Sequence, residues 1–195
     1  MPRSGSSLIG EDYQLPLEDC GVIQTIINLS IINIMSKQPA QLTVNMFRDS
    51  PWPGNILSNF AQTPFVIDGV ACSCSEAFIQ SLKSSNPEEQ VKLCSLQGKD
   101  AWERGSKLTD RIFSAGCVWW LGEILPLHST EHFQLVKRGL VAKFNQSEVA
   151  RDALIGSGTA KLLHDFGKPK ASRESLPIEV FCEIITEIRN VIQSE

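Results

Sequence analysis

The chain has 195 residues, of which 42% are hydrophobic and 21% are charged, so it is long enough for one sizeable core and short for two independent ones. Its formal net charge of -4 excludes the class of proteins that bind duplex nucleic acid non-specifically, because such binding needs a broad basic face. None of the six cysteines shows Cys-x-x-Cys spacing, which indicates a reduced, cytoplasmic chain.

Residues 1–40 are predicted to be an N-terminal appendage, either partly disordered or packed as a helix. No secretory signal is expected, because an apolar run comes only after the acidic residues Glu11, Asp12, Glu18 and Asp19. The run Val22–Met35 is interrupted by polar residues and is shorter than the roughly 20 apolar residues of a membrane span. Its pattern fits a helix or a strand equally. We therefore expect no membrane partner, and a main domain at residues 41–195.

The first part of the main domain predicts a hairpin followed by a helix. Pro64–Cys72 has the pattern of two short strands around an Asp68-Gly69 turn, since Asp and Gly tolerate the positive φ of tight hairpins. Ser75 is then expected to cap a helix that runs to Lys83 and buries its apolar side. This arrangement places Glu76 in the first helical turn.

Later helices are indicated by their start signals. Asn86 and Pro87 predict the start of a helix that ends at Gln97-Gly98. A second helix is expected after Ser129 or Thr130, and a third from Ser147 to Gly156. The last begins near Pro177, with an apolar stripe formed by Val180, Phe181, Ile184, Ile185, Ile188 and Ile192. The predicted fold class is α+β, a predominantly helical single domain with a small β-hairpin or sheet.

Glu76 is the first candidate for chemistry. It follows a predicted strand and has Cys72, Cys74, Phe78 and Ile79 as neighbours, so it is expected to be partly desolvated. Desolvation raises the pKa of a carboxyl group toward that of a working general acid or base, although a helix N-terminus acts in the opposite direction. The alternative is that Glu76 only complements the helix dipole, as acidic residues in first turns often do.

Several short motifs, in this order, resemble the YbiA-like proteins, also called the NADAR family. The first half of the resemblance consists of Leu57-Ser58-Asn59-Phe60, Pro64-Phe65, Asp68-Gly69, Ser75-Glu76, Gln80 and Lys83. The second half consists of Leu140–Gln146, Leu154, Ala160-Lys161-Leu162 and a closing helix that ends near Arg189. Together they cover roughly residues 45 to 190, and they imply a YbiA-like fold for the main domain.

The resemblance implies an N-glycosidase that hydrolyses the bond between a ribose anomeric carbon and nitrogen. Family substrates are ribosylated pyrimidine intermediates of riboflavin synthesis and ADP-ribose attached to guanine. Glu76 matches the catalytic glutamate of the family, and a carboxylate suits an oxocarbenium-like transition state. Asn59 is expected to orient a ribose hydroxyl or a base edge, with Phe60 and Gln80 beside it. Lys83 or Arg48 would meet a phosphate, or Lys83 would attack the anomeric carbon.

The chain also departs from the family pattern. Ala77-Phe78-Ile79 replaces a stretch in which the family has His and Tyr. His128 aligns by spacing with a functional Trp, whose ring Trp119 or Trp120 could supply instead. Asp165 is the remaining acidic candidate in a shortened loop before the last helix. These departures leave the substrate open.

Two other functions remain as alternatives. The first is a binding module that keeps an ADP-ribose or nucleotide pocket without turnover. The second is a zinc hydrolase, because His128-Ser129-Thr130-Glu131-His132 matches the His-x-x-Glu-His spacing. That site needs both imidazoles on one helical face, whereas a cap at Ser129 or Thr130 is expected to leave His128 outside the helix. The main prediction is thus an enzyme without metal or cofactor, and its oligomeric state is left open.

Overall fold

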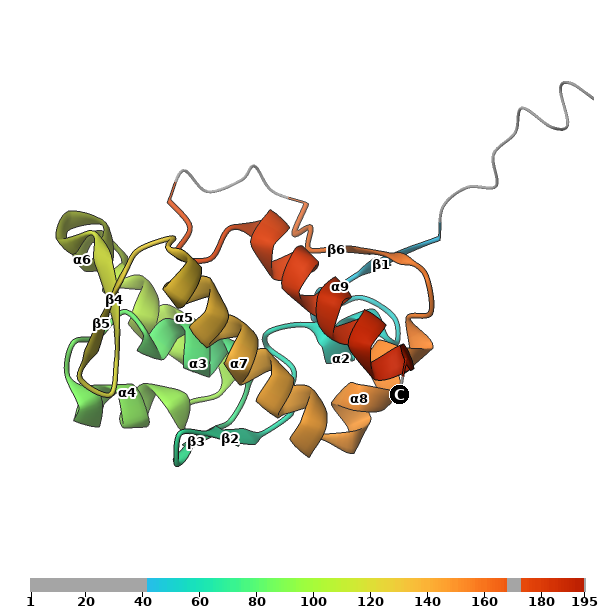
Figure 1. The fold of residues 1–195 in the computed structure, drawn as a ribbon, viewed down its shortest axis with the longest axis horizontal. Helices are drawn as coiled ribbons and strands as arrows, with labels where there is room; N and C mark the ends of the chain where they lie inside the picture. The colour runs from blue at the N-terminus through green and yellow to red at the C-terminus, as the bar shows by residue number, and fades with distance from the viewer. Residues whose placement is uncertain (1–41, 168–172, 195) are drawn as a thin grey trace, which may run out of the picture. The chain divides into compact units, whose positions relative to one another are not determined.

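The structure is a computed structural model that describes residues 42–167 and 173–194. The elements in chain order are β1 (Thr43–Asn45), α2 (Gly54–Leu57), β2 (Phe65–Ile67), β3 (Val70–Cys72), α3 (Ser75–Ser81), α4 (Pro87–Cys94), α5 (Gly98–Ser106), α6 (Thr109–Ala115), β4 (Cys117–Trp120), β5 (Glu123–Pro126), α7 (Thr130–Gln146), α8 (Glu148–Gly156), β6 (Lys161–Leu163) and α9 (Ile178–Ser194) (Figure 1). This arrangement confirms the α+β class with helices dominant.

The described strands form three separate two-stranded sheets. Strands β2 and β3 make the predicted antiparallel hairpin, with Asp68 at φ 49° and Gly69 at φ 81° in its turn. Asp68 also accepts a hydrogen bond from Trp120 Nε1 at 2.8 Å and pairs with Arg138 of α7, so the turn is fixed to the rest of the domain. Strands β4 and β5 are antiparallel, and β1 pairs in parallel with β6 from the other end of the sequence.

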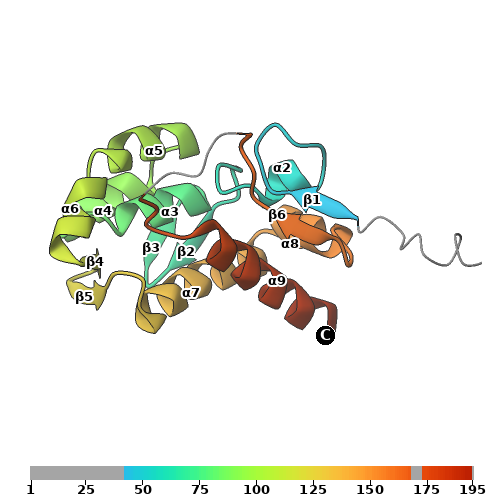
Figure 2. The same ribbon diagram turned by 90° about the horizontal axis from the view of Figure 1, so that it is seen from above.

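Helix α3 lies at the centre of the described domain, and all of its residues are buried. The ring of Phe78 packs edge-on against Phe65 at 6.1 Å and against Trp120 at 5.2 Å between ring centroids. Helix α7 contacts α3 and both α8 and α9 (Figure 2). The stripe of α9 is buried as predicted at Phe181, Ile184, Ile185, Ile188 and Ile192, whereas its first residue, Val180, is half-buried against the core.

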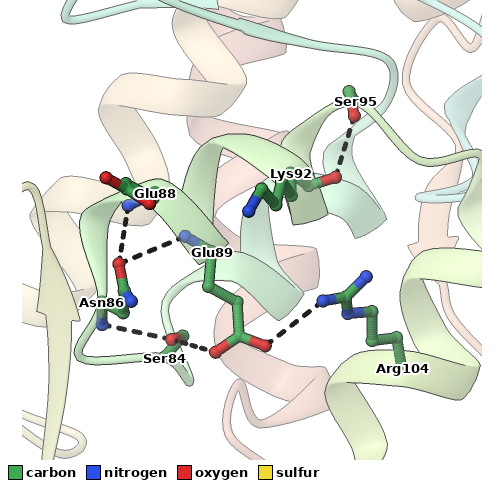
Figure 3. Close-up of polar contacts among 7 residues, drawn as sticks. All are labelled: Ser84, Asn86, Glu88, Glu89, Lys92, Ser95 and Arg104. Carbon is green, nitrogen blue, oxygen red and sulfur yellow. Dashed lines mark hydrogen bonds and ion pairs between the residues drawn. The ribbon is translucent and has the colours of Figure 1, made fainter.

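The predicted cap of α4 is confirmed. Asn86 Oδ1 accepts hydrogen bonds from the backbone N–H groups of Glu88 at 2.9 Å and Glu89 at 3.4 Å (Figure 3). Ser129 and Ser147 cap α7 and α8 in the same way, through the N–H groups of His132 and Ala150. These helices therefore begin where their capping side chains predict.

Three predicted boundaries are wrong, the first because α3 ends at Ser81 and not at Lys83. The helix from Pro87 ends at Cys94, and Gly98 opens α5 instead of terminating the preceding helix. Gly98 serves a close approach, because a Cβ there would lie 2.9 Å from Phe60 Cα. Ser75 is the first residue of α3, whose N-cap is Cys74 without a side-chain hydrogen bond. In its place, the N–H of Glu76 is satisfied by the Asn59 carbonyl oxygen at 2.9 Å.

The predictions for residues 1–40 lie outside the described residues, so the proposed division into an appendage and a main domain stays a prediction. Within residues 42–167 and 173–194, no helix is both long and apolar enough to cross a membrane.

Candidate active site

Glu76 lies where the loop after α2 meets the start of α3. Only 7% of the residue is exposed, and its backbone N–H donates to the carbonyl oxygen of Asn59 at 2.9 Å. One helical turn later, Gln80 Nε2 donates to Glu76 Oε1 at 2.8 Å, as the i, i+4 spacing on one helical face allows. The structure thus brings together Glu76, Gln80 and the backbone of Asn59, which form the Glu76 cluster.

Burial controls the pKa of the Glu76 carboxyl group. Desolvation raises this pKa above its ordinary value, and it outweighs the hydrogen bond from Gln80 and the charge of Lys83, both of which lower it. A carboxyl group with a raised pKa binds and releases a proton nearer to neutral pH. Glu76 is therefore suited to acid–base chemistry.

Lys83 lies two turns beyond Glu76, and only 5% of it is exposed. Its Nζ donates to Thr109 Oγ1 at the start of α6, at 3.0 Å. Desolvation lowers the pKa of this ammonium group from 10.5 to about 8, and the charge of Glu76 opposes the change. The Lys83 amine is thus close to the point where its neutral and charged forms are equally populated at mildly alkaline pH.

Lys143 is a further functional candidate, for which no role was predicted from the sequence. It lies on α7 and is 1% exposed, and its Nζ makes no hydrogen bond or ion pair with any described residue. Its Nζ is 5.3 Å from the centroid of the Phe144 ring. Burial lowers its pKa from 10.5 to about 8, and a charge on Cys74 would oppose this. An unpaired ammonium group is costly to bury, so its retention needs a reason.

A signal for Lys143 was present in the sequence. The residue follows Leu140 by three positions and precedes Phe144, both on the apolar stripe of the helix. Lys137 on the same helix is only half-buried and donates to Glu187 Oε2 at 2.8 Å. Lys143 takes the buried position.

Three buried side-chain oxygens around Glu76 lack a hydrogen-bond partner among the described residues. They are Asn59 Oδ1, Ser75 Oγ and Gln80 Oε1. Most buried polar atoms in proteins are paired, so a group of such acceptors beside a buried carboxyl group indicates a place for hydroxyl or amino donors.

Phe60 and Arg48 lie nearer the surface. Phe60 is half-buried against Gly98 of α5. Arg48 is exposed and pairs with Asp49 at 3.3 Å, with its guanidinium 5.8 Å from the centroid of the Phe47 ring. Arg48 is thus available to an anion from solvent, but no described hydrogen bond or ion pair joins it to Glu76.

Asp165, Trp119 and His128 occupy three other places. The backbone of Asp165 is held by the Asn45 side chain in two hydrogen bonds of 2.8 and 2.9 Å, and its exposed carboxylate accepts the Gly167 N–H. The half-buried ring of Trp119 is covered by the Arg111 guanidinium at 5.3 Å. His128 Nε2 is 2.8 Å from the Glu174 carbonyl oxygen. Within the described residues, none of the three bonds to Glu76, Gln80 or Lys83.

The zinc alternative lacks the geometry that it requires. Ser129 caps α7, so His128 lies outside the helix as expected, with φ 62°. Its backbone N–H donates to His132 Nδ1 at 3.3 Å. Burial and the neighbouring His128 lower the pKa of His132 to about 4. The described residues contain no group of three or more side chains placed to hold a metal ion.

Two hollows lie on the described part of the surface. One, of about 580 Å³, is lined by Glu89, Leu96, Asp100, Glu103, Arg104, Lys107 and Leu108. The other, of about 380 Å³, is lined by Gln134, Lys137, Arg138 and Val141. Glu76, which is 7% exposed, belongs to neither lining.

Comparisons with known proteins agree with this description. The sequence profile of a family described as bacteriophage protein GP30.3 matches residues 51–190. An uncharacterized 17.1 kDa protein from the Gp30-rIII intergenic region of Enterobacteria phage T4 is 30% identical over 140 residues, which cover 71% of this chain and 91% of that protein. The NMR structure of the E. coli protein YbiA is similar with a TM-score of 0.53 and 17% identity, covering 80% of this chain and 91% of that one. The YbiA-like fold is thereby confirmed.

Proposed function

The chain belongs to the bacteriophage protein GP30.3 family, and on that premise we propose that it is a cytoplasmic N-glycosidase built on a YbiA-like fold. Its substrate is a ribosyl phosphate or ADP-ribosyl compound, either a riboflavin-pathway intermediate or ADP-ribosylated guanine. The reaction is hydrolysis of the bond between the ribose anomeric carbon and the nitrogen of a base. The residues assigned to it all lie within the profile match except Arg48.

The observation that carries this proposal is the buried carboxyl group of Glu76. It is bonded to Gln80, and its pKa is raised by burial. Cleavage of an N-ribosyl bond develops positive charge on the sugar, which a nearby carboxylate stabilises. The same group can remove a proton from the attacking water. One buried carboxylate thus provides both requirements of the reaction, with no demand for a metal ion.

The residues around Glu76 fit the rest of a ribosyl substrate. The unpaired oxygens of Asn59 and Ser75 are acceptors for ribose hydroxyl groups or a base amine. Lys83 and Lys143 supply two buried amines, whose charged forms attract an anionic substrate. With a pKa of about 8, Lys83 also has the neutral fraction that a covalent attack on the anomeric carbon needs. Phe60, Arg48, Asp165, His128 and Trp119 remain candidates for contacts further from the reacting bond.

A binding module without turnover is the second candidate function. Its support is the replacement of His and Tyr by Ala77-Phe78-Ile79 in the segment that follows Glu76, together with the burial of the carboxyl group. Such a module would keep the acceptors and the buried amines, and would bind the same compounds without cleaving them.

The two functions are separated by incubating the protein with a panel of N-ribosyl phosphates and ADP-ribosylated guanine substrates, in the presence of a chelator, and following products by mass spectrometry. The proposal predicts a free base and a matching ribosyl product from at least one member. Binding of a panel member without base release would favour the binding module. A base released only when chelator is omitted would point to a metal-dependent reaction and contradict the mechanism.

A further inference from the structure

Helix α5 approaches α3 at one point without room for a side chain. A Cβ on Gly105 would lie 2.3 Å from Gln80 Oε1 and 2.6 Å from Gln80 Cβ, both far below an ordinary contact. Ala101, one turn earlier on α5, is fully buried and packs with Cys74 and Ala77. Small residues on α5 therefore let its backbone lie directly against the Gln80 side chain.

This contact restricts the Gln80 side chain, which is 5% exposed. Its Nε2 donates to Glu76 Oε1 at 2.8 Å, and its Oε1 has no hydrogen-bond partner among the described residues. With α5 on one side and Glu76 on the other, the amide cannot turn away without a movement of α5. The hydrogen bond to Glu76 is thus built into the packing of two helices.

We propose that Gln80 and Gly105 are positioning residues for Glu76: the backbone of α5 at Gly105 confines the Gln80 amide, and that amide orients the Glu76 carboxylate and favours its ionised form. The role rests on the proposed function, in which an ionised Glu76 stabilises the transition state and activates water. It differs from the contact with substrate that the sequence suggests for Gln80.

The other charged groups near Glu76 do not come from α5. Lys83 acts on Glu76 from the turn just after α3, and Cys74 precedes Glu76 in the chain. Lys143 on α7 interacts electrostatically with Cys74. The charged residues of α5 are all exposed, namely Lys99, Asp100, Glu103 and Arg104, as is Lys107 at its C-cap. No charged side chain of α5 is therefore buried beside Glu76, and a change at Gly105 tests the route through Gln80.

The test is a ¹³C NMR titration of carboxyl-labelled glutamate in the whole chain without substrate, with the Glu76 signal assigned from Glu76→Gln. Gln80→Met keeps the size of the side chain and removes the amide donor, so the pKa of Glu76 should rise by about one unit or more. Gly105→Ala should also raise the pKa of Glu76. Because no turnover is measured, the result is independent of whether the proposed function is correct.

Gly139→Ala is the matched control. A Cβ there would lie 2.3 Å from Phe78 Cε1, so it disturbs α3 as severely, but through a ring that has no bond to Glu76. It should lower stability and leave the pKa of Glu76 unchanged. With Gln80→Ala already present, adding Gly105→Ala should cause no further shift, since the two act through one side chain.

Two results would overturn the proposal: an unchanged Glu76 pKa in Gln80→Met, or an equal shift in Gly139→Ala and Gly105→Ala. If Gly105→Ala does not fold, Gln80→Met and the Gly139 control still decide. Where the panel yields a substrate, Gln80→Met should lower kcat by about tenfold with little change in KM, and the acidic limb of the pH profile should move upward with the titration.

Discussion

Helices α3 and α4 pack against each other and both have glutamate in the first turn, yet the two sets of carboxylates are in opposite environments. In α4, Glu88 is exposed, and Glu89 accepts from Ser84 Oγ at 2.7 Å and pairs with Arg104 at 3.5 Å (Figure 3). In α3, Glu76 is 7% exposed and bonded to a buried amide. The same position in a helix thus serves two different purposes.

The difference bears on the simpler interpretation of Glu76 as a residue that only complements the helix dipole. A carboxylate near water at a helix start gains roughly 0.3–1 kcal/mol in this way at little cost. Glu88 and Glu89 fit that account. Glu76 is desolvated, which raises its pKa and makes its charged form costly, so the dipole alone does not explain its position. The comparison supports a chemical role for Glu76.

The largest expected effect concerns these glutamates directly. Glu76→Gln keeps the shape of the side chain and removes its charge and basic oxygen, so turnover should fall on the order of 10²-fold or more. Glu88→Gln, at the start of α4, should leave turnover unchanged. Rates measured on a substrate from the panel check both. Similar rates for wild type and Glu76→Gln would show that Glu76 on α3 is no more catalytic than the glutamates at the start of α4.

The second prediction uses the buried amines. In the folded chain Lys83 and Lys143 have a pKa of about 8, below the ordinary value of 10.5. Between these pH values the unfolded chain binds more protons than the folded chain. The contribution of these lysines to the free energy of unfolding therefore increases as the pH is raised from about 8 to about 10.5. Below pH 8 both lysines are charged in the folded chain, and the free-energy cost of burying each charge is fully present. This cost is at most about 3 kcal/mol for each lysine.

Denaturant titrations across that range measure the effect. Lys143→Met should reduce the alkaline rise, because one of the two lysines is gone. The same rise in wild type and in Lys143→Met would show that the Lys143 amine keeps its ordinary proton affinity.

The third prediction concerns stability at neutral pH. Lys143→Met replaces an unpaired, buried ammonium group with an apolar side chain of similar length, and should raise the free energy of unfolding by about 1–3 kcal/mol. Turnover should fall at the same time, as expected for a residue kept for function. Lys137→Met, on the outer side of the same helix, should change stability by less than about 0.5 kcal/mol. A destabilised, fully active Lys143→Met would make Lys143 a structural residue.

The smallest effect belongs to α4. Asn86→Ala removes the side chain that accepts the N–H groups of Glu88 and Glu89, and should cost about 1 kcal/mol of stability. Because α4 supplies no group to the Glu76 cluster, turnover per folded molecule should not change. Thermal unfolding and a rate assay on the same sample check this; lost turnover in a folded variant would tie α4 to the site.

Local signals in the sequence predicted the parts of the fold that depend on neighbouring residues. The Asp68-Gly69 turn, the Asn86, Ser129 and Ser147 caps, and the stripe of α9 all appear where expected. Each is determined by side chains within a few positions of the element that it defines. The parallel pairing of β1 with β6 was not predicted, because strands of three residues from opposite ends of the domain leave no local pattern.

The misassignments have physical causes as well. Glycine often terminates a helix, and Gly98 was predicted to do so. Its absence of a side chain instead allows the close approach to Phe60, a contact that no local sequence pattern shows. As a result α5 was not separated from α4. Lys143 was passed over because lysine on an amphipathic helix is expected to face water. The place of Glu76 in the first helical turn could be predicted from the sequence. Its hydrogen bond to Gln80, and the contact of α5 with Gln80, are seen only in the packing of the two helices.

The central claim is that the Glu76 cluster catalyses and does not merely bind. The most direct test is the number of base molecules released per chain when the wild-type protein is incubated with excess substrate from the panel, quantified by mass spectrometry. The account predicts many releases per chain, abolished by Glu76→Gln in a protein that still binds the substrate. One release or fewer per chain, with tight binding in both proteins, would contradict it.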